Sequence, residues 1–362
     1  MKVSREDARN LLVDAVRISS PSGHEQEVAR LLADRMEAFN LSSHIDEMGN
    51  VIGEIGDTHG PTILLLGHID TITTLLPVID TEDRLLGRGS VDAKGALCCF
   101  ICAAAAMVSA PCKFIVIGAV GEEADSRGAR SLEGKYEPSA VIVGEPSAAD
   151  AIVIGYKGKI GGVYTRLCQP GHIAGPGTNA AIDASQFWRT IEAYLRDQPI
   201  GGGMFERAEP SISRISGDAI MAELHFDVRI PVGFDISGFL NYAANKSGSG
   251  FLRIDEAISA VEFSRSSPPA RALIASLRAA SQDPKIKVKT GTCDMNVVSR
   301  FWDAPMVAYG PGDSKLDHSL EENLPYAEYF KAIEILSDAL RRLSAELIAD
   351  QPISELQSTW RR

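Results

Sequence analysis

The sequence lacks the features of a membrane or exported protein. Its best candidate for a bilayer span, 96–112, is uncharged but short, is rich in Ala and Cys, and is interrupted near its end by Pro111. The first ten residues, MKVSREDARN, contain no apolar core of a signal peptide. We therefore expect no membrane segment, and predict that 96–112 is a buried helix leading into a strand.

Basic residues are outnumbered by acidic ones, and the cysteines are not spread along the chain. Lys and Arg number 36 against 48 Asp and Glu, giving a formal net charge of -12. This balance argues against non-specific binding to nucleic acid or to an anionic membrane. Most of the six cysteines crowd one apolar stretch, 98–112, instead of forming a disulfide framework. That distribution favours reduced thiols and a cytoplasmic location.

The order of apolar patterns along the chain predicts the fold class. A length of 362 residues favours two domains. Apolar residues at helical spacing run from 5 to 39, with a turn at 19–23 that divides them into two helices. Short, continuous apolar runs typical of buried parallel strands lie at 62–66, 114–120, 140–143 and 306–309. The main domain is therefore predicted to be α/β, with a mostly parallel central sheet and helices on both faces.

The middle of the chain follows another pattern. Between 222 and 230, apolar residues alternate strictly with polar ones, which is typical of a strand with one face in water. The segment 180–195 has the spacing of an amphipathic helix that would cover such a sheet. We predict an inserted α+β domain at 160–265, within an α/β domain formed by 1–159 and 266–362.

Each buried run is followed by residues that can bind a metal. In open α/β sheets the ligand crevice lies beyond the carboxyl ends of the strands, so residues there converge although they are distant in sequence. Neighbouring glycines let the backbone turn sharply at these ends. The candidates are His68 and Asp70 after the first run, Glu122 and Glu123 after the second, Glu145 after the third and His318 after the fourth.

Imidazoles and carboxylates without a thiolate suit a catalytic zinc or cobalt site. Two histidines and three carboxylates suffice for two ions that share one ligand. Asp92 is the natural bridge, because it lies in the glycine-flanked loop 87–95 that opens an Ala-rich helix. Two metals about 3.5–4 Å apart can lower the pKa of a water between them and polarise a carbonyl.

Two sets of close neighbours indicate a division of roles. Glu122 and Glu123 are adjacent, so in an extended segment they point to opposite sides. One can bind metal while the other moves a proton from water to the leaving amine. In His68-Ile69-Asp70, residues i and i+2 share a side, so Asp70 can accept the second imidazole N–H and fix the tautomer.

Taken together, the motifs resemble the two-zinc aminoacylase/carboxypeptidase-type metallopeptidase family, whose members include acetylornithine deacetylase and succinyl-diaminopimelate desuccinylase. The resemblance covers nearly the whole chain, and the ordered set is far more specific than any single motif. The motifs are Gly67-His68-Ile69-Asp70-Thr71, Gly87-Arg88-Gly89 with Asp92-Ala93-Lys94-Gly95, Gly121-Glu122-Glu123, Gly144-Glu145-Pro146 and His318.

The resemblance implies two zinc ions per chain, with cobalt as an alternative, and a role for each motif residue. It also implies a non-proline cis peptide at Asp92–Ala93 and identifies the inserted domain as a lid and dimerisation domain, so we expect a homodimer. By position, Asp92 bridges, His68 and Glu145 hold one ion, Glu123 and His318 hold the other, Glu122 is the general base, and Asp70 orients His68. His172 matches a lid histidine that in dimeric relatives reaches the partner's active site and stabilises the developing oxyanion.

A finer resemblance is to the branch that releases lysine or ornithine from an acidic amino-group carrier protein in lysine or arginine biosynthesis. It is carried by 121–130, 155–159, 291–296 and 309–318. A lysine substrate needs a cation for its carboxylate and a carboxylate for its distal amine. We expect Asp294 and Asn296 in the substrate pocket, and Lys157, Lys159 and Lys315 facing the acidic carrier.

Other interpretations remain open. Within the same chemistry, the chain could be a deacetylase of N-acetyl-lysine, N-acetylornithine or a related N-acyl amino acid. A metal-free binding protein is disfavoured, because such a protein should have lost a ligand or the base and every expected position is filled. Among single residues, simple surface charge is the favoured interpretation of Lys157 and Lys159. For Glu145 the alternative to a ligand is a cap of the following turn or helix.

Overall fold

The computed structural model describes residues 3–169, 179–198 and 203–350. The chain divides into two compact units. Unit 1 comprises 1–154, 263–287 and 293–362, and unit 2 comprises 155–262 and 288–292. The inserted domain was predicted at 160–265; unit 2 begins and ends a few residues earlier and also takes in the short segment 288–292.

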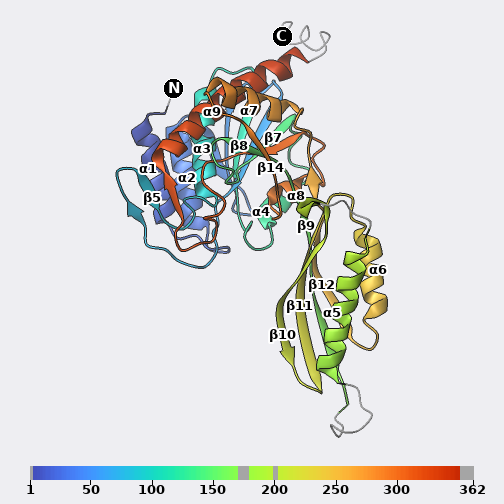
Figure 1. Ribbon diagram of the computed structural model, residues 1–362. Helices are drawn as coiled ribbons and strands as arrows, with labels where there is room; N and C mark the ends of the chain where they lie inside the picture. The colour runs from blue at the N-terminus through green and yellow to red at the C-terminus, as the bar shows by residue number, and fades with distance from the viewer. Residues whose placement is uncertain (1–2, 170–178, 199–202, 351–362) are drawn as a thin grey trace. The chain divides into compact units, whose positions relative to one another are not determined.

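The centre of the main sheet is parallel (Figure 1). Strand β3 (Thr62–His68) pairs in parallel with β6 (Lys113–Ala119) on one side and β7 (Ala140–Val143) on the other, and β15 (Met306–Ala308) pairs in parallel with β7. Their side chains are almost all buried, as expected for strands covered on both faces. The four apolar runs therefore form the predicted strands.

Antiparallel strands extend this sheet at both edges. Beyond β6 lie β2 (Val51–Gly56) and β1 (Ser42–Ile45). Beyond β15 lies β8 (Ala151–Tyr156), which runs antiparallel to β15 and to β13 (Val261–Glu262). Strand β14 (Lys285–Lys289) also pairs with β8, outside this antiparallel set. A separate small sheet joins β4 (Ile79–Asp80), β5 (Arg84–Leu86) and β16 (Asn323–Pro325). The fold is α/β with a largely parallel central sheet, as predicted.

Helices cover the sheet of unit 1. The predicted pair at 5–39 forms α1 (Arg5–Arg17) and α2 (Gln26–Ala38), and α2 packs on β1 and β2. Helix α3 (Lys94–Ala104) packs on β3 and β6 and against the long α9 (Tyr326–Ala349). Helix α7 (Pro268–Ala279) packs on α9, β7 and β15. Two short helices, α4 (Arg127–Arg130) and α8 (Asp294–Val298), lie near each other.

Helix α3 is buried along its entire length. A short 3-10 turn, η1 (Ala105–Met107), follows it and leads towards β6, which confirms the buried helix and strand predicted at 96–112. Lys94 at its first turn is itself buried, and its Nζ donates to the carbonyls of Ala15 at 3.1 Å and Ile18 at 2.7 Å. Lys94 thereby satisfies carbonyl groups at the end of α1, while burial lowers its pKa to about 8. Among the described residues, no helix is long and apolar enough to cross a membrane.

Unit 2 is an antiparallel sheet with helices packed on it. The strand order is β10 (Glu209–Gly217), β11 (Met221–Ile230), β9 (Gly158–Leu167) and β12 (Phe251–Ile258). Helix α5 (Ala180–Arg196) packs on β9, β10 and β11, and α6 (Ile236–Lys246) packs on β12 and α5. A one-turn 3-10 helix, η2 (Met204–Glu206), precedes β10. The amphipathic helix at 180–195 and the alternating strand at 222–230 are both confirmed.

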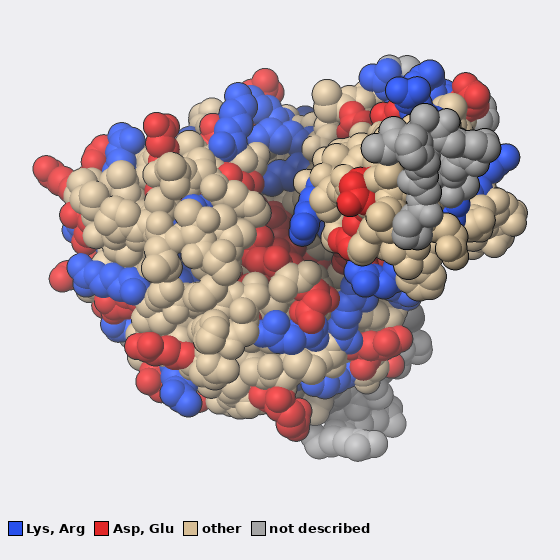
Figure 2. All heavy atoms as spheres, turned by 90° about the horizontal axis from the view of Figure 1, so that it is seen from below, with Lys and Arg blue, Asp and Glu red and all other residues tan. Residues whose placement is uncertain are grey.

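Each unit has its own hydrophobic core. The core of unit 1 is formed by α1, α2, α3, α7 and α9 with the central strands, and that of unit 2 by α5, α6 and the inner face of its sheet. On the face drawn in Figure 2, basic side chains are interspersed with acidic ones, so neither sign covers the whole of that face.

Candidate metal centre

The candidate ligands come from the carboxyl ends of the parallel strands. His68 is the last residue of β3, Glu123 follows β6, and Glu145 follows β7. His318 lies in the segment after β15, and its backbone is left-handed, with φ of 59°. Because β3, β6, β7 and β15 run in the same direction, their carboxyl ends meet at one edge of the sheet.

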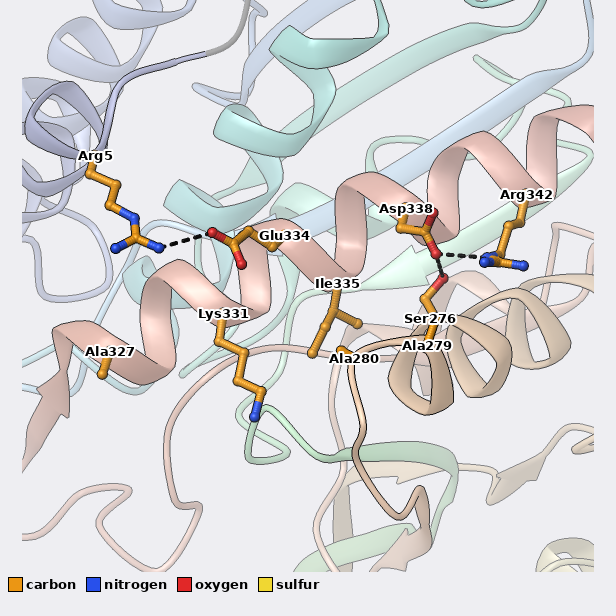
Figure 3. A pocket seen from close by; sticks show the side chains of 10 residues that line it. All are labelled: Arg5, Ser276, Ala279, Ala280, Ala327, Lys331, Glu334, Ile335, Asp338 and Arg342. Atoms are coloured by element: carbon orange, nitrogen blue, oxygen red, sulfur yellow. Dashed lines mark hydrogen bonds and ion pairs between the residues drawn. The ribbon is translucent and has the colours of Figure 1, made fainter.

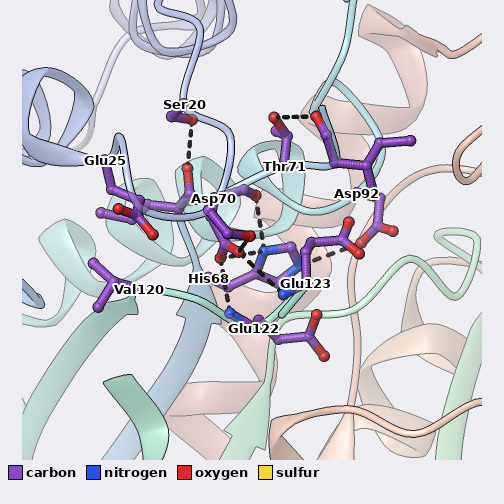
Figure 4. Close-up of polar contacts among 12 residues, drawn as sticks. Ser20, Glu25, His68, Asp70, Thr71, Asp92, Val120, Glu122 and Glu123 are labelled. Atoms are coloured by element: carbon purple, nitrogen blue, oxygen red, sulfur yellow. Dashed lines mark hydrogen bonds and ion pairs between the residues drawn. The ribbon is translucent and has the colours of Figure 1, made fainter. Parts of the chain in front are cut away.

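Asp92 stands between the two histidines. Its Oδ1 lies 3.3 Å from His68 Nε2, and its Oδ2 lies 3.2 Å from His318 Nε2. Glu123 Oε1 lies 2.9 Å from the same His318 nitrogen. Figure 4 shows the side chains of Asp92 and Glu123 extending to one side of the His68 ring. The peptide bond Asp92–Ala93 is cis, as expected.

This donor set fits divalent cations. One ligand atom from each of Asp92, Glu123 and His318 lies within 4.8 Å of the others. Two ligands bound to one tetrahedral zinc lie roughly 3.3 Å apart, close to the separations between these donor atoms. Among the described residues, the ion-pair partners of Asp92 and Glu123 are histidines. Carboxylates gathered around imidazoles are the chemistry of a catalytic zinc site.

The histidine pKa values reflect the same arrangement. Hydrogen bonds to Asp92 and Glu123 raise the pKa of His318 to about 10. Burial lowers the pKa of His68, but hydrogen bonds to Asp70 and Asp92 outweigh burial and raise it well above its usual value. In the protein without metal, protons on the two imidazoles therefore balance the carboxylates. A divalent cation would displace these protons on binding.

Asp70 holds the ends of two strands together. Its carboxylate accepts the backbone N–H groups of Glu122 and Glu123, each at 3.0 Å, and the hydroxyl of Ser22 at 2.7 Å. His68 Nδ1 lies 3.0 Å from the Asp70 carbonyl oxygen and 3.4 Å from its carboxylate. Asp70 thus contacts both His68 and the segment that carries the two glutamates. Ser22 was missed because its loop has the composition of an ordinary turn.

Glu122 is surrounded by other acidic groups. Burial raises its pKa well above the usual range; His68 opposes this shift, while Glu145 and Asp294 add to it. A carboxyl group with a raised pKa can both accept and return a proton near neutral pH. Glu145, buried directly after β7, therefore lies near enough to influence Glu122 electrostatically.

The two predicted pocket residues differ in their surroundings. Asp294, the first residue of α8, is buried, and burial raises its pKa to about 7. Among the described residues its Oδ1 has no hydrogen-bond partner. Asn296 is also buried, but its side-chain oxygen accepts the backbone N–H of Cys293 at 3.0 Å and so helps to cap α8.

The three predicted carrier-facing lysines also differ. Lys157 is buried, and its Nζ donates to the Arg207 carbonyl and to Glu209, both at 2.8 Å. Lys159 forms ion pairs across the sheet of unit 2, at 3.5 Å with Asp227 and 3.2 Å with Glu256. Lys315 is exposed. The first two lysines therefore have internal partners, whereas Lys315 remains at the surface. His172 lies outside the described residues.

A hollow elsewhere in unit 1 lacks the histidines of the candidate metal centre. It has a volume of about 550 Å³ and is lined by α7, α9 and the start of α1. Figure 3 shows two ion pairs among its charged side chains, Arg5 with Glu334 and Arg342 with Asp338, and a hydrogen bond from the Ser276 hydroxyl to Asp338. Among the described residues, no histidine or cysteine lines it. It is not a candidate metal site.

Comparison with known proteins decides the family. The family model for peptidase family M20/M25/M40 matches residues 64–342. The chain belongs to this family. As a member of the M20 family it is a metal-dependent hydrolase of amide bonds, and the resemblance seen in the motifs is confirmed.

Two relatives match over nearly their full length. The LysW-lysine hydrolase of Deinococcus radiodurans is 38% identical, with 93% of this chain and 97% of the relative covered. The LysW-lysine/LysW-ornithine hydrolase of Saccharolobus islandicus is 30% identical, with 94% and 96% covered.

Solved M20-like structures share the fold. An M20 family metallo-carboxypeptidase from Sulfolobus solfataricus superposes with a TM-score of 0.79 at 18% identity, covering 93% of this chain and 99% of that one. A tripeptidase from Staphylococcus aureus gives 0.80 at 16% identity, covering 95% and 100%.

Proposed function

We propose that this M20 family member hydrolyses the amide that joins lysine or ornithine to an acidic amino-group carrier protein and releases the free amino acid. The observation that carries the proposal is the 38% identity, over 93% of the chain, to a LysW-lysine hydrolase. The 30% identity to a LysW-lysine/LysW-ornithine hydrolase leaves both amino acids as substrates. Such an enzyme would act in lysine or arginine biosynthesis.

The proposed metal centre holds two zinc ions, with cobalt as the alternative. His68 and Glu145 would bind one ion, Glu123 and His318 the other, and Asp92 both. The support is the position of the Asp92 carboxylate, whose two oxygens each face a different histidine. Bound metal supplies Lewis-acid polarisation of the amide carbonyl and lowers the pKa of water.

The protein's own groups would move the proton. Glu122 would take a proton from the attacking water and deliver it to the leaving amine nitrogen as the C–N bond breaks. Its crowding by Glu145 and Asp294 suits this role, because a raised pKa lets the carboxyl group carry the proton between the two steps. Asp70 would fix the tautomer of His68, and His172 would donate to the developing oxyanion.

For substrate recognition, Asp294 is the stronger of the two predicted pocket residues. It lies near enough to Glu122 to raise that residue's pKa, and one of its oxygens is without a partner among the described residues. A cationic amine of lysine or ornithine would supply that partner. Lys315, which is exposed, would contact the acidic carrier.

We further propose a homodimer formed through unit 2 and a cytoplasmic location. Strand β10 lies at the edge of its sheet and exposes two apolar side chains, Ile212 at 39% and Ile215 at 53%. An edge of this kind can pair with a second copy. The six cysteines all lie within the described residues and are free thiols, as expected in a reducing compartment.

The test compares substrates on one enzyme preparation loaded with zinc or cobalt. We expect kcat/KM for carrier-linked lysine or ornithine to exceed that for N-acetyl-lysine and N-acetylornithine. A preference for the acetyl compounds would instead establish a small-molecule deacetylase. Less than one bound metal per chain after loading, measured by elemental analysis, would favour a non-catalytic binding protein.

A further inference from the structure

A buried carboxylate outside the predicted ligand set contacts the loop that carries Asp92. Glu322 is 1% exposed. Its Oε1 accepts three backbone N–H groups from this loop: those of Gly89 at 2.9 Å, Val91 at 2.9 Å and Asp92 at 3.1 Å. These N–H groups lie in the loop just before α3, and a buried N–H group needs a hydrogen-bond acceptor. One oxygen of Glu322 therefore serves as the acceptor for three N–H groups of the loop.

Arg88 occupies the other oxygen of Glu322. Its Nη1 donates to Glu322 Oε2 at 2.7 Å, and its Nη2 donates to the Ser319 carbonyl at 3.0 Å. Its Nε donates to the Thr74 carbonyl at 2.9 Å. Arg88 is 6% exposed, so the ion pair is buried and each charge depends on the other. The guanidinium also ties the Asp92 loop to the segment just after His318.

The backbone brings the same two segments together. Strands β5 and β16 pair antiparallel, with Asn323 opposite Leu86, and the N–H of Gly87 donates to the Glu322 carbonyl at 3.1 Å. Strand pairing stops at this point, and Glu322 and Arg88 continue the connection with side chains. Beyond them lie the two residues whose side chains meet at 3.2 Å, Asp92 and His318.

We propose that Glu322, neutralised by Arg88, is a positioning residue of the metal centre that holds the Asp92 loop in register with the His318 segment. The inference rests on the proposed metal centre but not on the proposed substrate. By fixing the backbone N–H of Asp92, Glu322 directs the two carboxylate oxygens towards His68 and His318. Groups that orient metal ligands in this way usually change metal affinity about 10–100-fold when removed.

The chain offers a matched control for this contact. Asp46 Oδ1 also accepts three backbone N–H groups, those of Met48, Gly49 and Asn50, at 2.9–3.0 Å. Its other oxygen likewise pairs with a cation, Lys135, at 3.2 Å. Asp46 shapes the turn between β1 and β2, which carries no proposed ligand. Asp46→Asn therefore makes the equivalent change, carboxylate to amide, in a turn that carries no proposed ligand.

The experiment measures metal affinity in Glu322→Gln and Asp46→Asn by competition with a chromogenic zinc chelator. In Glu322→Gln, the side-chain NH2 group must face either the backbone N–H donors or Arg88, and it can accept a hydrogen bond from neither. We therefore expect zinc affinity about 10–100-fold weaker than in the wild type. The visible absorption spectrum of the cobalt-loaded protein should change as well. Asp46→Asn should lose folding stability in urea while its zinc affinity and cobalt spectrum stay as in the wild type.

Wild-type zinc affinity and an unchanged cobalt spectrum in Glu322→Gln would overturn the proposal. An equal loss of affinity in Asp46→Asn would also overturn it, because the effect would then be general destabilisation. If Glu322→Gln does not fold, Arg88→Lys replaces it: lysine keeps the charge but loses the guanidinium fork, and we expect a smaller loss in the same direction. Failure of the wild type to bind metal would refute the metal centre itself, whereas an unexpected substrate preference would leave this proposal standing.

Discussion

Glu122 differs from its neighbour Glu123 in what surrounds it, and this difference decides which of them should move protons. Glu123 contacts His318 at 2.9 Å, whereas the pKa of Glu122 is raised by burial and by other carboxylates. We expect Glu122→Gln to lower kcat about 10²–10⁴-fold, because general acid–base catalysis is lost, while metal content stays unchanged. Elemental analysis alongside turnover measurements tests both parts.

Glu133→Gln is the control for this substitution, since Glu133 is exposed in the same unit and touches no proposed ligand. It should retain wild-type turnover. Near-normal turnover in Glu122→Gln would move the general base to another residue, and loss of metal would make Glu122 a ligand.

His318 links stability to pH in protein stripped of metal by a chelator. Its pKa is about 10 in the folded chain against a usual 6.5. A raised pKa means that the folded state binds the proton more tightly, so the stabilisation is complete below pH 6.5 and is lost as pH rises towards 10. We expect the urea midpoint of chelator-treated protein to fall over this window, and His318→Gln to show a smaller fall. Equal slopes in the two proteins would remove His318 from the linkage.

At the scale of elements, substitutions on exposed edge strands can test the proposed dimer. Both β10 and β1 lie at a sheet edge and expose isoleucine: Ile215 at 53% and Ile45 at 40%. We expect Ile215→Lys to shift the mass from dimer to monomer in sedimentation velocity, because a lysine on an edge strand opposes pairing between chains. Ile45→Lys should leave the mass unchanged. A dimer that survives Ile215→Lys, or dissociates with Ile45→Lys, would place the interface elsewhere.

The elements that could be predicted from the sequence are those whose burial leaves a local pattern. Continuous apolar runs became β3, β6, β7 and β15, and a strict alternation became β11. Four of the five candidate ligands could be named because each follows such a run, and Asp92 because it lies in a glycine-flanked loop. Partners such as Ser22 and Glu322 could not be found, because the hydrogen bonds of one isolated side chain impose no periodicity on the sequence. Segment 288–292 joins unit 2 through pairing with distant residues, as in the bond from Lys157 N–H to the Lys289 carbonyl.

At the scale of the whole molecule, the two units should respond differently to metal. All five proposed ligands belong to unit 1, and unit 2 has a separate core. Metal at 100 times its Kd stabilises the unit that binds it by about 2.7 kcal/mol. We expect zinc to raise the calorimetric transition of unit 1 and to leave that of unit 2 in place, with hydrogen exchange assigning each transition. Asp92→Ala should abolish the shift. An equal shift of both units would contradict this expectation.

The position of His318 beyond β15 also bears on how the enzyme is made. Four of the five proposed ligands precede the insertion in the chain, whereas His318 follows it. A polypeptide leaving the ribosome, whose N-terminal parts fold first, therefore has four donors of the proposed centre before it has the fifth. It acquires that donor only after the insertion and β15 have been synthesised. On this basis, we expect the second ion of the proposed centre to be bound only after His318 has been synthesised.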